Sequence, residues 1–240
     1  MSLVHEPKEI DAILLCGGLG KRLRDVVNDR PKVMAEIDGR PFLDVLIDFV
    51  ASYGFRRFIL CMGYMGHKIK QHYQSKTGSV DILFSEEKEP LGTGGAIKNA
   101  EPLIKSNPFL VMNGDSFCPL NLDEFINFHL TKRALLSIAL ANVKQTSDYG
   151  AIGLDDSKRI LSFDEKGRKK KGLVNAGVYL FDRRVLSLIP DNTPYSLEHD
   201  LFPQLANREL YGYITQESFI DIGTPERFEK AKEILLRERA

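Results

Sequence analysis

The sequence predicts an α/β protein with a doubly wound sheet, and three observations lead to this class. The 240 residues are enough for one domain with a sizeable core. Short apolar stretches alternate along the first half with segments in which apolar residues recur at helical spacing. Glycine-rich or Asn-Gly-Asp segments follow two of the apolar stretches directly, where a parallel strand would turn towards the next helix.

The first half supplies four expected strands and the helices between them. The strands are expected at 12–16, 58–62, 80–84 and 109–112. Residues 42–53 have helical spacing and stop at Gly54, residues 66–76 are expected to form a helix or lid, and a short helix is expected after Gly95. This alternation is typical of parallel βαβ units.

The second half consists of shorter strands, and we expect it to form a smaller lobe packed on the first half. The strands are expected at 135–142, 150–154, 159–163, 177–182, 210–215 and 219–222. A helix is expected around 196–206, and a last helix begins with Thr224 as its cap and Pro225 in its first turn. We therefore interpret 1–240 as a single domain with halves at about 1–133 and 134–240.

The composition excludes several functional classes. Lysine plus arginine and aspartate plus glutamate number 33 each, so no bulk charge favours nucleic acid or a membrane surface. No apolar run approaches the roughly 20 residues of a membrane helix, and the first residues do not resemble a signal peptide. The cysteines Cys16, Cys61 and Cys118 are far apart, so buried thiols in a cytoplasmic protein are expected. None of the five histidines is assigned a catalytic role.

The loop CGGLGKRL, which begins at Cys16, has the chemistry of a phosphate-binding loop. It is not a P-loop, because Leu15 stands where that motif needs glycine and Arg22 stands where it needs serine or threonine. It also lacks the glycine spacing of the dinucleotide fingerprint. Glycines nevertheless let backbone N–H groups approach an anion, and Arg22 and Lys32 can neutralise phosphates. The alternative is an ordinary glycine turn with solvated cations.

Seven segments in series resemble the sugar-nucleotide pyrophosphorylases, which are nucleotidyltransferases that couple a sugar 1-phosphate to a nucleoside triphosphate. The segments are GGLGKRL with RPK, EPLGTGGA, NGDS, DYGAI, FDEK, NAGVYLF and FIDIGTP. The length and the run MAEIDGRPFLD most resemble the D-glycero-D-manno-heptose 1-phosphate guanylyltransferases. The resemblance implies a Rossmann-like doubly wound mixed sheet of the nucleotide-diphospho-sugar transferase type, with a nucleotide-binding half and a small sugar-binding lobe.

The resemblance also implies a role for individual residues. The triphosphate would lie on Gly17, Gly18, Gly20, Arg22 and Lys32. The base and ribose would lie along Leu91, Gly92, Thr93, Gly94 and Gly95, next to Asn113, Gly114 and Asp115. The sugar phosphate would contact Gly150, Glu165, Lys166 and Asn175. Mg²⁺ would be held by Asp115 and Asp221.

From the residues alone, simpler interpretations stay open. Residues 90–96 can form a glycine-rich turn without a ligand, Asp115 can be a turn or cap aspartate, and Asp221 can end an edge strand. The cationic run 168–171 is interpreted as a solvated loop.

The implied reaction needs no side-chain nucleophile, because the attacking oxygen of a sugar 1-phosphate is already ionised near neutral pH. It needs in-line placement behind the α-phosphate and charge neutralisation, which Arg22, Lys32 and Lys166 would supply as the catalytic residues. The implied substrates are GTP and D-glycero-α-D-manno-heptose 1-phosphate. Mannose 1-phosphate with GTP, or another hexose 1-phosphate with a uridine or thymidine nucleotide, is the alternative. The implied setting is cytoplasmic polysaccharide biosynthesis, and a homodimer is compatible with the family.

Two other classes fit less well. A glycosyltransferase usually carries Asp-x-Asp at its metal, and the segment Asp115-Ser116-Phe117 lacks the second aspartate. A non-catalytic sensor of nucleotide sugars would be expected to lose Arg22, Lys32 or Asp115, and all three are present.

Overall fold

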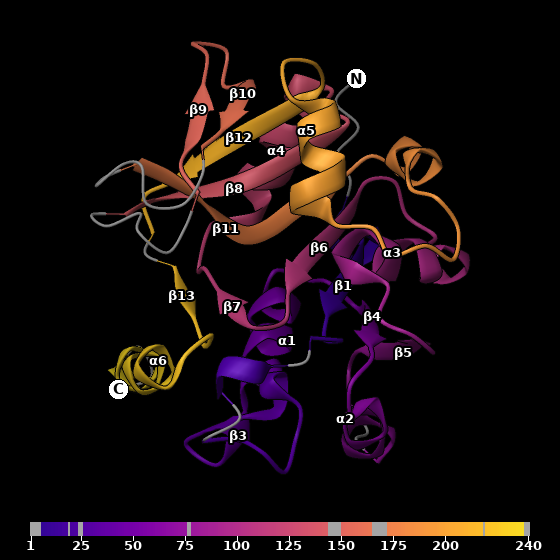
Figure 1. The fold of residues 1–240 in the computed structure, drawn as a ribbon, viewed down its shortest axis with the longest axis vertical. Coiled ribbons are helices and arrows are strands. Elements are labelled where there is room, and N and C mark those ends of the chain that lie inside the picture. The colour runs from indigo at the N-terminus through magenta and orange to yellow at the C-terminus, as the bar shows by residue number, and fades with distance from the viewer. Residues whose placement is uncertain are drawn as a thin grey trace.

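A central sheet runs through the molecule, flanked by helices on both faces (Figure 1). The computed structural model describes residues 6–18, 20–23, 26–75, 78–143, 150–164, 172–217 and 219–237. Among these residues seven strands form the main sheet, in the order β12-β8-β11-β6-β1-β4-β5. Their bounds are β12 Leu210–Thr215, β8 Leu136–Val143, β11 Gly172–Phe181, β6 Phe109–Asn113, β1 Asp11–Leu15, β4 Arg57–Met62 and β5 Asp81–Glu86.

The sheet is mixed, with one strand reversed in its middle. β1 pairs in parallel with both β4 and β6, and β4 pairs in parallel with β5. β11 is antiparallel to β6 and to β8, and β12 is parallel to β8. The carboxyl ends of β1, β4, β5 and β6 therefore meet at one edge of the sheet, where parallel α/β sheets place their ligands.

Two hydrophobic clusters, one on each face of the sheet, hold the helices in place. Alternate residues of β1 belong to opposite clusters, with Ala12 and Leu14 in the first and Ile13 in the second. The first cluster includes residues of α1 Phe42–Ser52, α2 Gly66–Gln74, α4 Leu122–Lys132 and α6 Pro225–Arg237. The second includes residues of α3 Gly92–Asn99, α5 Phe202–Leu205, the 3₁₀ segment Arg183–Leu188 and the π-helical turn Leu197–Leu201.

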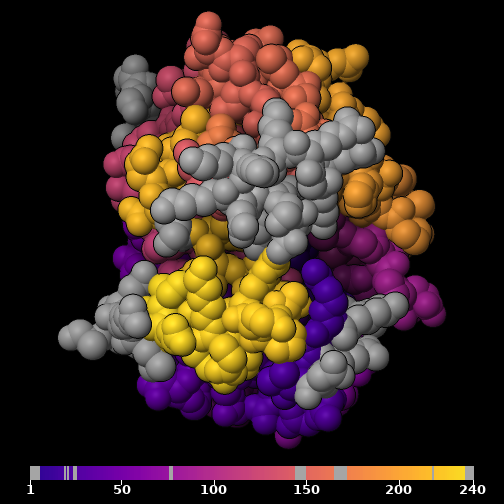
Figure 2. All heavy atoms as spheres, turned by 60° about the vertical axis from the view of Figure 1, so that its left-hand side comes forward, coloured from indigo at the N-terminus to yellow at the C-terminus, as the bar shows by residue number. Residues whose placement is uncertain are grey.

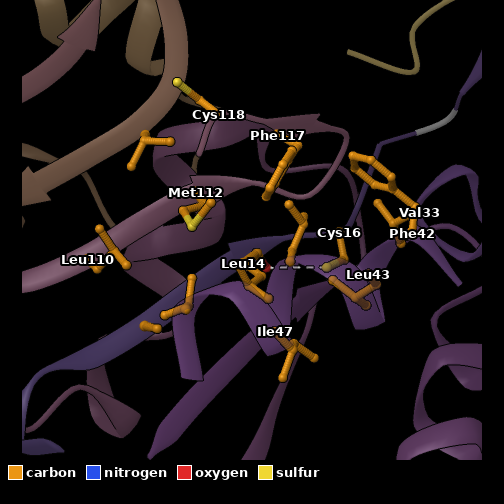
Figure 3. Close-up of a cluster of buried hydrophobic side chains, with 14 of the residues drawn as sticks. Leu14, Cys16, Val33, Phe42, Leu43, Ile47, Leu110, Met112, Phe117 and Cys118 are labelled. Carbon is orange, nitrogen blue, oxygen red and sulfur yellow. Dashed lines mark hydrogen bonds between the residues drawn. The ribbon is translucent and has the colours of Figure 1, made fainter. Parts of the chain in front are cut away.

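The first cluster also joins the two ends of the chain. Figure 3 shows the buried side chains of α1 around Leu14 and Met112 of the sheet. Phe228 of α6 belongs to the same cluster as Leu23 and Val33 near the start of the chain. In Figure 2 the C-terminal residues, in yellow, lie directly above the N-terminal part, in indigo. This packing brings the β13–α6 corner towards the glycine-rich loop.

Most predicted elements are present, and the differences have physical causes. Helix α4 was not predicted, although the Asn121 side chain caps it by accepting a hydrogen bond from the Glu124 N–H (3.1 Å). Helix α3 begins at Gly92 rather than after Gly95, because the glycines themselves form its first turn. Thr224 does cap the last helix, accepting from the Arg227 N–H through its hydroxyl (3.4 Å).

The second half belongs to the same main sheet as the first. Its long strands β8, β11 and β12 extend the central sheet. Three two-stranded pairs complete the described strands: β9 Ile152–Leu154 with β10 Ile160–Phe163, β7 Ser116–Phe117 with β13 Ile220–Asp221, and β2 Glu36–Ile37 with β3 Arg40–Pro41. The three cysteines are buried, as predicted. None of the helices in the described ranges combines the length and the apolar character required to cross a membrane.

Candidate functional site

A pocket of about 300 Å³ lies at the carboxyl ends of β1, β5 and β6. Its lining residues are Leu15, Gly17, Gly18, Glu87, Pro90, Gly92, Thr93, Ala96, Asn113 and Asp115. Six of these ten were predicted for the nucleotide site from the sequence. Two hollows of about 450 and 490 Å³ lie beside α1 and α2, but none of the predicted site residues lines them. We therefore take the smaller pocket as the candidate site.

The glycines of the first loop differ in what makes them necessary. A Cβ on Gly17 would lie 2.7 Å from Oε1 of Glu87, whereas a Cβ on Gly18 would meet nothing within 4 Å. Gly20 has φ +58°, a conformation that favours glycine, and a Cβ there would lie 3.1 Å from Cβ of Lys32. Gly18 lines the pocket, and among the described residues no packing contact accounts for its lack of a side chain.

Lys32 and Asp115, both predicted for the site, form an ion pair. The Lys32 ammonium donates to Oδ2 of Asp115 at 2.6 Å, and the two side chains are 12% and 40% exposed. The Ser116 hydroxyl donates to the other oxygen, Oδ1, at 3.2 Å. The carboxylate thus stands at the pocket wall with a cation beside it.

Gly114, between Asn113 and Asp115, is required by the packing of the chain. Its N–H donates to the Leu15 carbonyl at 3.0 Å, and a Cβ would lie 2.6 Å from that oxygen. The missing side chain lets the ends of β6 and β1 approach closely. Asp115 is thereby fixed directly above the end of the first strand.

Asp221 reaches the same corner through the β7–β13 pair. It lies opposite Ser116, and the next residue, Ile222, donates its N–H to the Asp115 carbonyl at 3.0 Å. The Asp221 carboxylate accepts from Arg227 at 2.9 and 3.1 Å and from the Gly223 N–H at 2.8 Å. The Arg22 guanidinium lies near this turn, 3.7 Å from where a Cβ on Gly223 would be. Four residues predicted to act on phosphate or metal therefore gather around one corner.

Asp115 and Asp221 are the two carboxylates expected to hold Mg²⁺. Among the described residues no three His, Cys, Asp or Glu side chains cluster as a complete protein metal site. Mg²⁺ is commonly held by only one or two carboxylates, with water and substrate phosphates completing its shell. Asp115, in the turn before β7, and Asp221, in β13, supply such hard oxygen atoms, and each has a cation of the chain beside it. These residues fit Mg²⁺.

The loop between β5 and α3 is clamped by a later segment of the chain. The N–H groups of Gly94 and Gly95 donate to the Tyr195 carbonyl at 2.8 and 3.0 Å, and the Tyr195 N–H donates to the Leu91 carbonyl at 2.8 Å. A Cβ on Gly92 or Gly94 would lie 2.8 or 3.1 Å from the Tyr195 carbonyl oxygen. These backbone groups were expected to face a base, but those of Gly94 and Gly95 are occupied by Tyr195. Gly92 still lines the pocket.

Thr93 links this clamp to the π-helical turn. Its hydroxyl donates to Oε2 of Glu198 at 2.9 Å and accepts from the Leu197 N–H at 2.8 Å. The Ser196 hydroxyl also donates to the same Glu198 oxygen, at 3.1 Å. The pocket wall on this side is therefore held by residues about a hundred positions further along the chain.

Asn113 and Asn175 meet around the buried Tyr179. The Asn175 amide donates to the Tyr179 hydroxyl at 2.9 Å, and its oxygen accepts from the Gly177 N–H at 2.9 Å. Gly177 has φ +75° and packs against Asn113, at a register shift between β11 and β8. Burial raises the pKa of Tyr179 far above its usual value. Within the described ranges the buried Oδ1 of Asn113 has no hydrogen-bond partner.

The predicted sugar-phosphate residues are only partly within the described chain. Glu165 and Lys166 lie outside the described residues. Gly150 is described, and a Cβ there would lie 2.7 Å from the carbonyl oxygen of Asp164, the residue before that segment. Asn175 has both polar side-chain atoms occupied by the chain itself.

Sequence reasoning missed Glu87, the second carboxylate of the pocket. It stands two residues before the segment EPLGTGGA and directly after β5. The available signal was an acidic residue at the carboxyl end of a predicted parallel strand, the position that identified Asp115. Glu87 is half-buried, its Oε2 accepts from the Leu91 N–H at 2.9 Å, and burial raises its pKa.

Comparison with known proteins is consistent with this geometry. The family model described as "Nucleotidyl transferase" matches residues 11–238. The chain belongs to this family. Among nucleotidyl transferases, the D-glycero-alpha-D-manno-heptose 1-phosphate guanylyltransferase of Aneurinibacillus thermoaerophilus is 36% identical over 227 residues, which cover 94% of this chain and 98% of the relative.

Two further proteins show how far the similarity extends. The crystal structure of HddC from Yersinia pseudotuberculosis complexed with GMP-PN has a TM-score of 0.83 and 36% identity, covering 94% of this chain and 99% of that one. The mannose-1-phosphate guanylyltransferase of Mycobacterium tuberculosis is 32% identical, covering 95% of this chain and 65% of the relative. The homologues of this chain thus include both heptose and mannose 1-phosphate guanylyltransferases.

Proposed function

We propose that this protein transfers GMP from GTP to D-glycero-α-D-manno-heptose 1-phosphate, giving the GDP-heptose and pyrophosphate. The observation that carries the proposal is the pocket, in which the Gly17–Gly18 loop, the β5–α3 loop and Asp115 meet at the carboxyl edge of the sheet. The similarity to heptose 1-phosphate guanylyltransferases over nearly the whole chain supports this choice of substrates. Mannose 1-phosphate is the second candidate acceptor, because mannose-1-phosphate guanylyltransferases are also homologues.

In the proposed reaction a phosphate oxygen of the sugar 1-phosphate attacks the α-phosphorus of GTP. The bond to the bridging oxygen breaks and pyrophosphate leaves with its electron pair. Arg22, Lys32 and the N–H groups of Gly17, Gly18 and Gly20 neutralise and orient the triphosphate, since a stationary positive charge lowers the barrier most where negative charge develops. No proton has to be removed from the nucleophile.

The remaining roles are proposed from the resemblance of the sequence to the family. Leu91, Gly92 and Thr93 border the base and ribose, and Asn113 contacts the ribose or sugar. Gly150, Glu165, Lys166 and Asn175 are proposed for the sugar phosphate, with Lys166 beside the attacking oxygen. Mg²⁺ held by Asp115 and Asp221 would supply further charge neutralisation on the phosphates.

The proposed setting follows from the substrates. GTP is a cytoplasmic metabolite, so we propose a cytoplasmic enzyme whose product supplies polysaccharide biosynthesis. A homodimer is compatible with this role.

The test is pyrophosphate release with Mg²⁺, measured for GTP, UTP, dTTP, CTP and ATP against heptose, mannose, glucose and N-acetylglucosamine 1-phosphates. The expected result is the highest kcat/KM for GTP with the heptose phosphate. A higher value for GTP with mannose 1-phosphate would transfer the proposal to the second candidate. Absence of turnover in every combination would contradict a nucleotidyl transfer function.

A further inference from the structure

A second polar hollow lies at the opposite end of β6 from the candidate site. It has a volume of about 210 Å³, and it is bordered by the start of β6, the end of α4 and the residues that follow β11. Of the described residues, none lines both this hollow and the nucleotide pocket. Pockets for drug-sized ligands occupy roughly 300–1,000 Å³, so a smaller hollow suits an ion or a very small molecule. Its lining residues are Asn107, Pro108, His129, Leu130, Arg133, Ala134, Asp182 and Arg184.

The side-chain oxygens of this hollow already have donors from the chain. Oδ1 of Asp182 accepts from the backbone N–H and from Nε of Arg184, at 2.9 Å each, and Oδ2 accepts from the same guanidinium at 3.3 Å. Oδ1 of Asn107 accepts from the Arg183 N–H at 2.8 Å. The final carbonyl groups of α4 accept from backbone N–H groups of the turn that follows the helix.

His129 supplies a buried donor to the hollow. It is 3% exposed, and its Nδ1 lies 2.9 Å from the hydroxyl of Ser137, which is completely buried on β8. Within the described chain this nitrogen is the one hydrogen-bond partner of that hydroxyl. A buried hydroxyl needs an acceptor for its hydrogen, so Ser137 donates to Nδ1 and the ring hydrogen is on Nε2. The Nε2–H group makes no hydrogen bond to any residue that the structure describes.

Two more donors of the hollow are without a partner among the described residues. They are the guanidinium of Arg133 and the amino group of Asn107. Because Asp182 and Arg184 balance each other, Arg133 leaves the hollow with a net positive charge. Arg133 also caps α4 with φ +48°, a conformation in which glycine or asparagine is more usual. Three donors from two separate segments therefore border one small space, and a guanidinium matches the oxygens of an oxyanion particularly well.

We propose that this hollow is a binding site for a free phosphate ion, held by Nε2–H of His129, the guanidinium of Arg133 and the amino group of Asn107. The burial of His129 lowers its pKa to about 4, so the ring is a neutral donor near pH 7 and binding requires no added proton. The site is separate from the proposed nucleotidyl transfer, because it lies at the other end of β6 and shares no lining residue with the nucleotide pocket.

Two pairs of variants test the proposal. In Asn107→Asp one carboxylate oxygen still accepts from the Arg183 N–H, while the amino donor becomes an oxygen that repels phosphate. Its matched control is Asn192→Asp, which adds the same charge at an exposed position outside the hollow. Arg133→Gln and its control Arg208→Gln each remove one exposed arginine, and of the two only Arg133 lines the hollow.

The experiment is a titration with inorganic phosphate at constant ionic strength near neutral pH, followed through the ring signals of His129 by ¹⁵N NMR. His129→Gln identifies these signals by their absence. The signals report on the hollow itself, so phosphate in the nucleotide pocket does not enter the result. We expect a saturable shift in wild type and a half-saturation concentration at least ~10-fold higher in Asn107→Asp and Arg133→Gln, the scale of losing one charge-assisted hydrogen bond. Both controls should stay within about 2-fold of wild type.

Thermal melting first establishes which variants are folded. If Asn107→Asp is not, Arg133→Gln decides the matter, since that side chain is exposed and has no hydrogen bond to a described residue. The absence of a saturable shift in wild type would overturn the proposal, and so would equal half-saturation in a folded variant and its control. A ring hydrogen found on Nδ1 rather than on Nε2 of free His129 would overturn it as well.

Discussion

The ammonium of Lys32 lies 2.6 Å from the carboxylate of Asp115, although the two residues are 83 positions apart in the chain. Each was predicted to serve a different partner, Lys32 a phosphate and Asp115 a metal ion. Because the two side chains are in contact, each balances the charge of the other until a substrate group takes its place. A phosphate chain would attract Lys32, and Mg²⁺ would attract Asp115. The pair thus holds both side chains in position at the pocket wall.

The first prediction concerns the charges of the site. Arg22→Ala and Asp115→Ala should each lower turnover at least ~100-fold, because each removes a group aimed at developing phosphate charge. Pyrophosphate release at saturating substrates measures this. Arg184→Ala and Asp191→Ala, which remove exposed charges that do not line the pocket, serve as controls and should stay within about 2-fold of wild type. Near-normal turnover in Arg22→Ala or Asp115→Ala would show that its assigned role is wrong.

The second prediction concerns Mg²⁺. Chelation of divalent ions should abolish pyrophosphate release, and Asp221→Asn should raise the Mg²⁺ concentration for half-maximal turnover at least ~10-fold, since one of two carboxylate ligands is lost. The control is Glu226→Gln, an exposed carboxylate of the adjoining helix α6. Full activity in the chelated enzyme, or the same Mg²⁺ dependence in Asp221→Asn and the control, would exclude the proposed ligand role.

The third prediction separates glycines that serve packing from those that serve the ligand. Gly114→Ala should lower the free energy of unfolding by about 2–3 kcal/mol, because its Cβ would collide with the Leu15 carbonyl. Gly18→Ala has open space and should leave this free energy within ~0.5 kcal/mol, while raising KM for GTP at least ~10-fold.

Urea unfolding and pyrophosphate-release kinetics together measure these two effects. Gly78→Ala is the matched control, because its Cβ also meets nothing within 4 Å and it lines a different hollow. Gly18→Ala with unaltered KM would remove that glycine from the nucleotide site.

The fourth prediction concerns stability in acid. Burial lowers the pKa of His129 from 6.5 to about 4, partly opposed by Asp182, so the folded state resists its protonation. A depressed pKa gives stability that is present above pH 6.5 and is lost as the pH falls towards 4. His129→Gln, which can still bond the Ser137 hydroxyl that now lies 2.9 Å from Nδ1, should lose about 2–3 kcal/mol less than wild type between pH 7 and 4. Urea unfolding at both pH values measures the difference, and equal losses in the two proteins would refute the assignment.

The local pattern of apolar residues and glycines was sufficient to predict much of the fold. The stretches that became β1, β4, β5 and β6 are apolar enough to form buried strands, and the helix that became α1 follows from its spacing and from the glycine that ends it. The pattern did not reveal the reversal of β11 or that the second half extends the main sheet. Strand pairing depends on which distant segments bury each other, and no local spacing encodes that.

For the site, the sequence by itself determined which chemical groups are present. These are glycines next to cationic residues, and acidic residues that follow strands. Gly17, Gly18, Asn113 and Asp115 were named from it, and all line the pocket. Only the tertiary structure decided which of these groups are already occupied and which stay open. Tyr195 takes the N–H groups of Gly94 and Gly95, whereas within the described part of the chain only one oxygen of Glu87 accepts a hydrogen bond, from Leu91. The physical reason is that hydrogen-bonding capacity belongs to a residue type, but its use depends on partners that folding brings from elsewhere in the chain.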